Sequence, residues 1–165
     1  MRKNKGFTLV ELLVAVAILG IMLAVAITAL GKARHNWTLR GEINEFMMTF
    51  YRARALAMKD ESIVRIHFDS ISNPRRYWIQ EKEGSLYIDV EKTSHSIPAQ
   101  ASYLINPQVD LVFLPDGRMV MEQGTGNYVL TFFTVRISMA TIPQHYFQIT
   151  LYPMGGVETT RHFVK

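Results

Sequence analysis

One carboxylate, that of Glu11, lies inside a stretch from Phe7 to Leu30 that holds no other ionisable side chain. A carboxylate inside an apolar helix is costly, and such groups are rare unless a partner accompanies them. The side chain is therefore expected to serve an interaction. In an ordinary secretion signal it would weaken the apolar segment, and in a simple membrane anchor it would only oppose insertion.

The residues that usually carry catalysis or bind metals form no recognisable motif. No histidine has a partner four residues away, and no serine lies in a nucleophile-elbow sequence. The segment Gly124-Thr125-Gly126 is too short for a phosphate loop, and Asp60-Glu61 is typical of a solvated helix end. We therefore expect no enzyme, no cofactor and no metal site, and His67 is expected to face solvent. The residues considered are His35, His67, His95, His145, His162, Ser62, Ser70 and Ser138.

Composition supports one modest folded domain without disulfides. The chain has 165 residues, 48% of them apolar, and no cysteine. The apolar content excludes intrinsic disorder. The net charge of +4 does not indicate a basic domain, because Arg2, Lys3 and Lys5 near the N-terminus supply three of these charges. Without them the balance is 15 basic against 14 acidic residues, so the remainder is not a basic domain.

The apolar stretch from Phe7 to Leu30 is long enough to cross a bilayer. Its 24 residues would span about 36 Å as a helix, against a hydrocarbon core of about 30 Å. The basic residues before it predict that its start stays cytoplasmic. Three interpretations compete: a cleaved signal ending near Ala24-Val25-Ala26, a simple anchor, or an exported subunit that keeps its apolar helix.

The segment Lys5-Gly6-Phe7-Thr8-Leu9-Val10-Glu11-Leu12 decides between them, because it resembles the cleavage motif of type IV prepilins. The similarity comprises a short basic leader ending in glycine, then phenylalanine, then Thr-Leu-x-Glu and an uninterrupted apolar run. It extends over the leader and the whole apolar helix.

The resemblance implies that prepilin peptidase cuts between Gly6 and Phe7 and that the new amino group of Phe7 is N-methylated. Glu11 becomes the fifth residue of the mature chain and is expected to neutralise the amine of a neighbouring subunit during assembly. At about 4 Å and an effective dielectric constant near 20, this attraction amounts to about 4 kcal/mol. Because both charges are costly to bury alone, the pair would also set the axial register of the subunits.

Helical periodicity continues beyond the apolar stretch. Proline is absent before Pro74, and apolar residues recur at helical spacing on one face. A single helix from Phe7 to Met58 is therefore predicted, with an apolar first half and an amphipathic second half. The apolar face consists of Leu39, Ile43, Phe46, Phe50, Ala53 and Leu56.

From Ser62 onward the pattern favours β-structure. About seven short, largely antiparallel strands are expected, with hairpin turns at 81–84, 115–118 and 153–156. The segment 129–137 is predicted as one strand, and Ser94 to Pro107 as a loop. The sequence therefore predicts an α+β, pilin-like fold, in which the long helix packs on an antiparallel β-sheet region.

Two of these turns indicate which group of pilin-like proteins the chain resembles. Phe113-x-Pro115-x-Gly117-Arg118 and the late turn at Gly155-Gly156 resemble the GspH/FimT group of minor pilins and pseudopilins. The organisation implied is a leader at 1–6, a transmembrane assembly helix at 7–30 and a periplasmic domain at 31–165. A cysteine pair near the C-terminus is absent, which favours a secretion pseudopilin over a pilus subunit.

The function implied is that of a minor pseudopilin of a type II secretion system, anchored in the bacterial inner membrane and assembled into a periplasmic pseudopilus. Its partners would be other pseudopilins, the prepilin peptidase and the inner-membrane assembly platform. The alternative is a FimT-like minor type IV pilin for pilus assembly or DNA uptake. Nucleic-acid binding is not expected, because Glu158 follows Gly155-Gly156 where closely spaced arginines would be needed, and Arg161 is the one arginine after these glycines.

Processing gives the first test. Mass spectrometry of the native protein is expected to show a chain that begins with N-methyl-Phe7. Gly6→Val is expected to leave the leader attached, because a branched side chain does not fit a cleavage site that takes glycine. A mature chain beginning at Ile27, directly after Ala24-Val25-Ala26, would instead identify the segment as a cleaved secretion signal.

Overall fold

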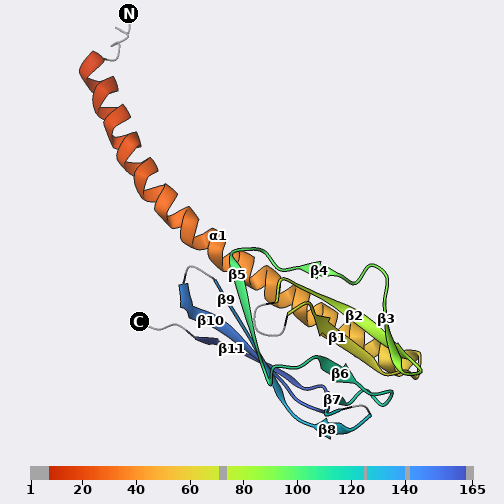
Figure 1. Cartoon of the computed structure of the whole chain (residues 1–165). Helices are drawn as coiled ribbons and strands as arrows, with labels where there is room; N and C mark the ends of the chain where they lie inside the picture. Colours follow the sequence, from red (N-terminus) through yellow and green to blue (C-terminus); the bar gives the residue numbers. More distant parts are fainter. Residues whose placement is uncertain (1–7, 71–73, 125, 140–141, 163–165) are drawn as a thin grey trace, which may run out of the picture. The chain divides into compact units, whose positions relative to one another are not determined.

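The computed structural model describes residues 8–70, 74–124, 126–139 and 142–162. One long helix, α1 (Leu9–Lys59), precedes an all-β region (Figure 1). The chain divides into two compact units, residues 1–38 and 39–165. The first unit therefore holds the initial part of α1, and the second holds its last part together with every strand.

In the first unit, α1 presents apolar side chains that nothing in the unit covers. Leu9–Ile27 is long and apolar enough to cross a membrane by length and composition, and none of it is buried. The helix was predicted to begin at Phe7, which lies outside the described residues. Its observed end at Lys59 is one residue beyond the predicted Met58.

In the second unit, the described residues form eleven strands in two antiparallel sheets. In the first sheet the order is β3-β2-β1-β6-β7-β8, with β4 paired to β2. Its strands are β1 (Val64–Phe68), β2 (Arg76–Glu83), β3 (Leu86–Asp89), β4 (His95–Ser96), β6 (Leu111–Phe113), β7 (Met119–Glu122) and β8 (Tyr128–Leu130). In the second sheet the order is β11-β10-β9-β5. Its strands are β5 (Ala101–Asn106), β9 (Phe133–Met139), β10 (Ile142–Leu151) and β11 (Val157–His162).

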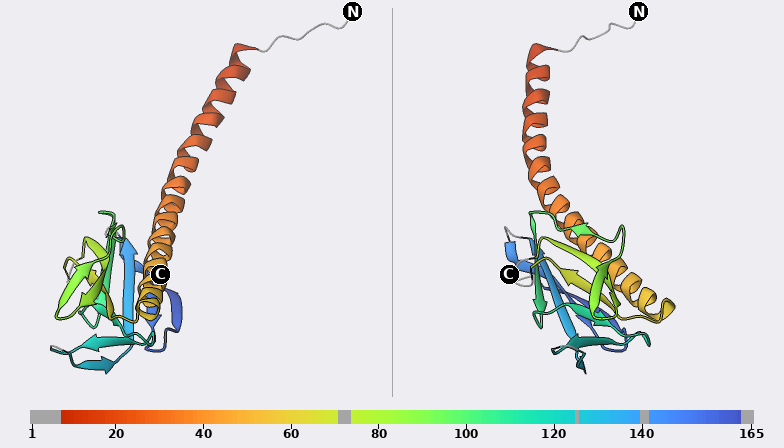
Figure 2. Two further views of the ribbon diagram at one scale, coloured as in Figure 1. Left: turned by 90° about the vertical axis from the view of Figure 1, so that its right-hand side faces the viewer. Right: turned by 45° about the vertical axis from the view of Figure 1, so that its right-hand side comes forward.

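The core of the second unit forms where α1 meets both sheets (Figure 2). The ring of Phe46 contacts Tyr77 of β2 at 5.7 Å between centroids and Tyr103 of β5 at 6.2 Å. Phe50 contacts Phe113 of β6 at 5.2 Å. The predicted apolar face is thus confirmed as a core face, although Leu56 is only half-buried. The buried apolar residues of the helix are Leu39, Ile43, Phe46, Phe50, Ala53 and Ala57.

The three predicted hairpins are confirmed as β2–β3, β6–β7 and β10–β11. The first turn is shorter than expected, because pairing extends to Glu83 opposite Leu86 and leaves only Gly84 and Ser85 in the turn. Glu81, Lys82 and Glu83 therefore belong to the strand and not to the turn, and side chains of a strand alternate between the two faces of the sheet.

Two predictions about the strands were wrong. The segment 94–107, predicted as a loop, contains β4 and β5, and the alternately buried Ala101, Tyr103 and Ile105 place β5 in the core. The segment 129–137, predicted as one strand, contains parts of β8 and β9 in different sheets. The chain leaves one sheet and enters the other at Thr131 and Phe132. These residues also favour β-structure, so the sequence does not reveal that the strand is interrupted there.

Phe50 tests this core. Phe50→Asp places a carboxylate where the native ring is fully buried, and the domain is expected to lose about 3 kcal/mol or more of stability. Met48→Asp on the same helix is the matched control, because Met48 is 68% exposed. Denaturant unfolding of both variants makes the comparison. A Phe50→Asp domain as stable as Met48→Asp would show that the sheets do not cover this face.

Candidate functional site

Glu11 lies in the first turn of α1 and is hydrogen-bonded to Thr8. The backbone N–H of Thr8 donates to Glu11 Oε2 at 2.9 Å, and the Thr8 hydroxyl donates to the same oxygen at 3.0 Å. In return the N–H of Glu11 donates to Thr8 Oγ1 at 3.2 Å. This reciprocal arrangement is a capping box, which satisfies backbone donors that no helical carbonyl reaches.

The capping box holds the carboxylate at the very start of the apolar helix. All three hydrogen bonds of the box reach Oε2 or the backbone of Glu11, and no bond to Oε1 occurs within the described residues. A carboxylate has about four lone-pair sites, so the second oxygen can accept from a further donor. Gly6 and Phe7, the predicted cleavage and methylation residues, lie outside the described residues.

A second polar arrangement joins the end of α1 to two hairpin turns. Arg54 Nε donates to the carbonyl of Gly117 at 2.9 Å, and Arg54 Nη2 donates to the carbonyl of Met154 at 3.0 Å. The N–H of Met119 also donates to the carbonyl of Pro153 at 2.8 Å. The turns that carried the GspH/FimT resemblance are therefore neighbours in space, although about forty residues separate them.

Glycine is required in both turns. Gly117 has φ of 78° and Gly155 has φ of 84°, values that side chains disfavour. A Cβ at Gly117 would come within 2.7 Å of Met58 Sδ, and one at Gly155 would overlap the Arg54 guanidinium. These two positions therefore need glycine because the backbone is left-handed there and Met58 and Arg54 lie close to the turns. The sequence alone did not identify this role of Arg54.

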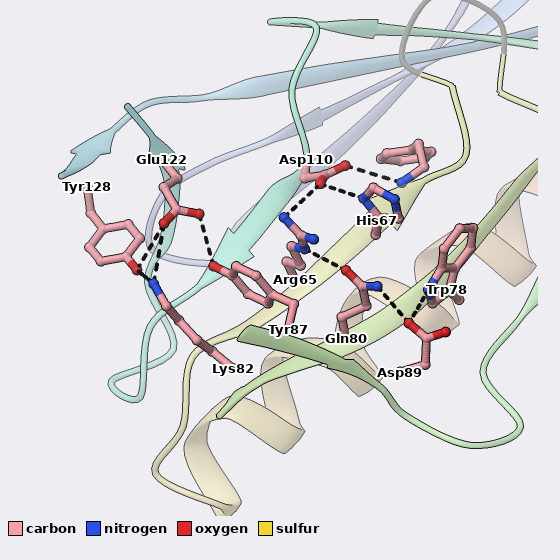
Figure 3. Close-up of polar contacts among 11 residues, drawn as sticks. Arg65, His67, Trp78, Gln80, Lys82, Tyr87, Asp89, Asp110, Glu122 and Tyr128 are labelled. Carbon is pink, nitrogen blue, oxygen red and sulfur yellow. Dashed lines mark hydrogen bonds and ion pairs between the residues drawn. The ribbon is translucent and has the colours of Figure 1, made fainter. Parts of the chain in front are cut away.

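The third arrangement crosses the outer face of the first sheet, where the β2–β3 hairpin reaches β7 and β8 through side chains (Figure 3). Lys82 Nζ lies 2.8 Å from the hydroxyl of Tyr128 and 3.4 Å from Glu122 Oε1. The hydroxyl of Tyr87 donates to Glu122 Oε2 at 3.0 Å. Because β1 and β6 lie between these strands in the sheet order, the sheet must curl strongly for the contacts to form.

The pKa values reflect these contacts. The hydrogen bond to Tyr128 raises the pKa of Lys82, although burial opposes this. Burial alone would raise the pKa of Glu122, but the hydrogen bond from Tyr87 and the charge of Lys82 outweigh it and lower this pKa. Burial, followed by the bond to Glu122, raises the pKa of the Tyr87 hydroxyl. Lys82 and Glu122 therefore both stay ionised near neutral pH.

Beside this cluster, His67 and Arg65 converge on Asp110. His67 Nδ1 lies 2.7 Å from Asp110 Oδ2, and Arg65 Nη1 lies 3.3 Å from the same oxygen. His67 lies on the face of β1 opposite the core, as expected, but its side chain is only partly exposed, because Asp110 and the edge of Trp78, at 4.7 Å between ring centroids, lie against it. Period-two alternation gave the correct face of the strand but not the side chains that cover it.

Across the described part of the chain, no group of three or more histidines, aspartates or glutamates is close enough to hold a metal ion. His95, for example, lies 3.1 Å from Glu42 Oε2 and packs β4 against α1. Asp60 lies 3.3 Å from Lys59 at the exposed helix end. Both side chains therefore contact neighbouring residues of the described chain.

Known proteins resemble this chain in its N-terminal motif and in its fold. The model of the prokaryotic N-terminal methylation motif matches residues 1–27. No curated protein sequence matches the chain.

Solved structures share the fold at low identity. The minor pseudopilin EpsH from the Type 2 Secretion System of Vibrio cholerae has 13% identity and a TM-score of 0.57, covering 74% of this chain and 96% of its own. Two crystal forms of the Pseudomonas aeruginosa type IV minor pilin FimU have TM-scores of 0.58 and 0.59 at 15% and 16% identity. They cover 74% of this chain and 92% and 87% of their own. The predicted pilin-like fold behind a prepilin-type N-terminus is confirmed.

Gly155 provides a test of the contact between helix and turns. Gly155→Ala is expected to destabilise the domain by about 2 kcal/mol or more, because the new Cβ meets Arg54 at a left-handed φ. Gly156→Ala is the matched control, since its φ is ordinary and its nearest side-chain neighbour would be 3.6 Å away. Thermal unfolding of the two variants distinguishes them. Equal melting temperatures would contradict the close approach of Arg54.

Proposed function

We propose that this chain is a minor pseudopilin, a structural subunit of a type II secretion pseudopilus. The observation that carries the proposal is the order of three features in one chain. A methylation motif matches residues 1–27, an apolar helix carries Glu11 in its first turn, and a pilin-like β domain follows. Taken singly, an apolar helix or a β domain occurs in many classes of protein, but an assembly subunit requires all three features together.

In this proposal, assembly works through the start of the apolar helix. After cleavage between Gly6 and Phe7, the amine of Phe7 and the carboxylate of Glu11 are the charges left at that end of the helix. The capping box keeps Glu11 Oε2 occupied by Thr8, and Oε1 can accept the methylated amine of a neighbouring subunit. An uncut leader would add Arg2, Lys3 and Lys5 where one amine fits.

The last part of α1 extends the surface available for assembly. Met48 and Tyr51 are 68% and 49% exposed and do not belong to the core face of α1, whereas Met58, 45% exposed, lies beside the turn at Gly117. Large exposed apolar side chains on one helix face are typical of a protein interface. Under the proposal this face packs against helices of neighbouring subunits, and the apolar stretch Leu9–Ile27 anchors the chain in the inner membrane before assembly.

A minor type IV pilin is the second candidate function. FimU matches with TM-scores of 0.58 and 0.59, level with the 0.57 of EpsH. Both candidates use the same cleavage, methylation and helix packing, so they differ in the machine that the subunit enters. Secretion-channel genes beside the gene for this chain would favour the first candidate, and pilus or competence genes would favour the second.

Glu11 tests the assembly mechanism. Glu11→Gln retains the oxygen that caps the helix but removes the charge, whereas Glu11→Ala removes both. Both variants are expected to insert into the membrane at least as well as the native chain, and both are expected to lose incorporation into filaments. Co-sedimentation with sheared filaments measures this. Normal incorporation of Glu11→Gln would show that capping, and not charge pairing, is what assembly needs.

DNA binding distinguishes an uptake role from both structural roles. Arg75 and Arg76 form a local basic pair beside Asp69. The Asp69 carboxylate accepts from the backbone N–H of Arg75 at 2.7 Å and lies 3.8 Å from Arg76 Nε. Residues 31–165 are therefore expected to bind duplex DNA only non-specifically, with Kd of about 1–100 μM at physiological salt. Gel-shift titration in about 150 mM salt measures the affinity. Much tighter binding that Arg75→Ala with Arg76→Ala abolishes would favour DNA uptake.

A further inference from the structure

The outer face of the first sheet holds a cavity that the assembly proposal does not use. Its volume is about 410 Å³, and it lies between the β2–β3 hairpin and the strands β6 and β7. Val112 of β6, only 1% exposed, lies at its wall, with Arg65 of β1 beside it. Among the lining side chains, Figure 3 labels Arg65, Lys82, Tyr87, Asp110 and Glu122. The lining residues are Arg65, Lys82, Ser85, Tyr87, Val109, Asp110, Val112, Glu122 and Gly124.

The charges around the cavity are balanced and partly withdrawn from water. The side chains of Arg65 and Lys82 are 22% and 13% exposed, and those of Asp110 and Glu122 are 14% and 20% exposed. Each carboxylate already faces a cation, Asp110 with Arg65 and Glu122 with Lys82. An added anion would meet two carboxylates and an added cation would meet two basic groups, so the cavity suits a neutral ligand.

Hydrogen-bonding capacity remains on both the donor and the acceptor side. Among the described residues, Arg65 directs only two of the five N–H donors of a guanidinium to protein acceptors, Gln80 Oε1 at 2.7 Å and Asp110 Oδ2 at 3.3 Å. The hydroxyl of Ser85 makes no hydrogen bond within the described part of the chain and stands at the mouth of the cavity. Asp110 accepts from the backbone N–H of Phe68 through Oδ1 at 3.2 Å and faces His67 and Arg65 through Oδ2, so one of its roughly four lone-pair sites remains. Glu122 is already occupied by Lys82, Tyr87 and Tyr128.

A hydroxyl group uses both kinds of capacity, because it donates one hydrogen bond and accepts others. Several hydroxyls on a rigid neutral ring therefore match a wall where paired cations and carboxylates alternate. The wall is also held in place, since the Arg65 guanidinium stacks 3.7 Å above the ring of Tyr87, whose hydroxyl is fixed by Glu122. The cavity volume falls within the usual range of about 300–1,000 Å³ for small-molecule sites.

We propose that this cavity between the β2–β3 hairpin and strands β6 and β7 binds a neutral saccharide unit. Arg65, Lys82 and Ser85 donate to the ring hydroxyls, Asp110 accepts from them, and Glu122 holds Lys82 and Tyr87 in place. The sugar can come from a free saccharide or from one residue of a polymer. The site is independent of Glu11 and the apolar helix, so its loss would leave filament assembly unchanged.

The test uses the full-length chain in a sugar-free detergent, with arginine labelled by ¹⁵N at Nε so that the Arg65 signal reports on the cavity. Glucose and maltose are titrated in parallel with glucuronate as the anionic analogue and glycerol as a small polyol. Saturable shifts of the Arg65 signal with glucose or maltose, and weaker binding of glucuronate, are expected. A longer maltose oligomer that binds at least as tightly as glucose points to a polymer end as the source, and a weaker one points to a free sugar.

Three variants locate the site. Ser85→Leu, in an exposed turn, is expected to fill the mouth and abolish binding with an unchanged melting temperature. Glu83→Ala, on the same hairpin but outside the lining, is the control and is expected to bind as the native chain does. Lys82→Met is expected to weaken binding about tenfold or more through the loss of a charged donor. Absence of a saturable shift with either sugar would overturn the proposal. So would tighter binding of glucuronate, an equal response to glycerol, or full binding by Ser85→Leu.

Discussion

Burial of apolar surface on a single helix is the constraint on which the rest of the structure depends. From Leu39 to Ala57, one face of α1 is covered by both sheets, and Phe46 and Phe50 are completely buried where the sheets meet. Over Leu9–Ile27 the helix has apolar side chains all round and nothing in its own unit covers them. The same element therefore needs two apolar environments, one supplied by its own strands and one supplied from outside the chain.

The contacts at the two ends of α1 differ accordingly. At the start, Thr8 and Glu11 cap the helix, and among the described residues no hydrogen bond reaches Glu11 Oε1, which suits a charge that is to be paired from outside. Near the other end, Arg54 donates through Nε and Nη2 to the carbonyls of Gly117 and Met154 and so connects the turns of two hairpins to the helix. The polar cluster around Lys82 and Glu122 lies on a third region, the outer face of the first sheet, and is independent of both.

Much of this arrangement could be predicted from the sequence because it depends on local periodicity. The helix end was correct to one residue, the buried face was correct at five of its positions, and all three hairpins were found. The prepilin-type motif predicts an assembly role for Glu11, and the family model for methylation matches residues 1–27, which include this segment.

The errors came from information that local pattern does not contain. The strand β5 follows a polar, proline-containing segment, and its alternation is short, so a loop was the simpler interpretation. The passage from β8 to β9 leaves no turn residue at Thr131 and Phe132, because the chain changes sheets without reversing. The roles of Arg54, His67 and Lys82 depend on partners more than forty residues away, which only the tertiary fold brings together.

The central claim is that the apolar helix is retained as an assembly element and is not a disposable signal or a passive anchor. Quantitative mass spectrometry of the filament fraction from cells with active and inactivated prepilin peptidase tests it most directly. Mature chains, with the helix from Phe7 onward intact, are expected to enter the filament fraction only when the peptidase is active. Chains that stay wholly in the membrane fraction despite active peptidase and abundant filaments would contradict it.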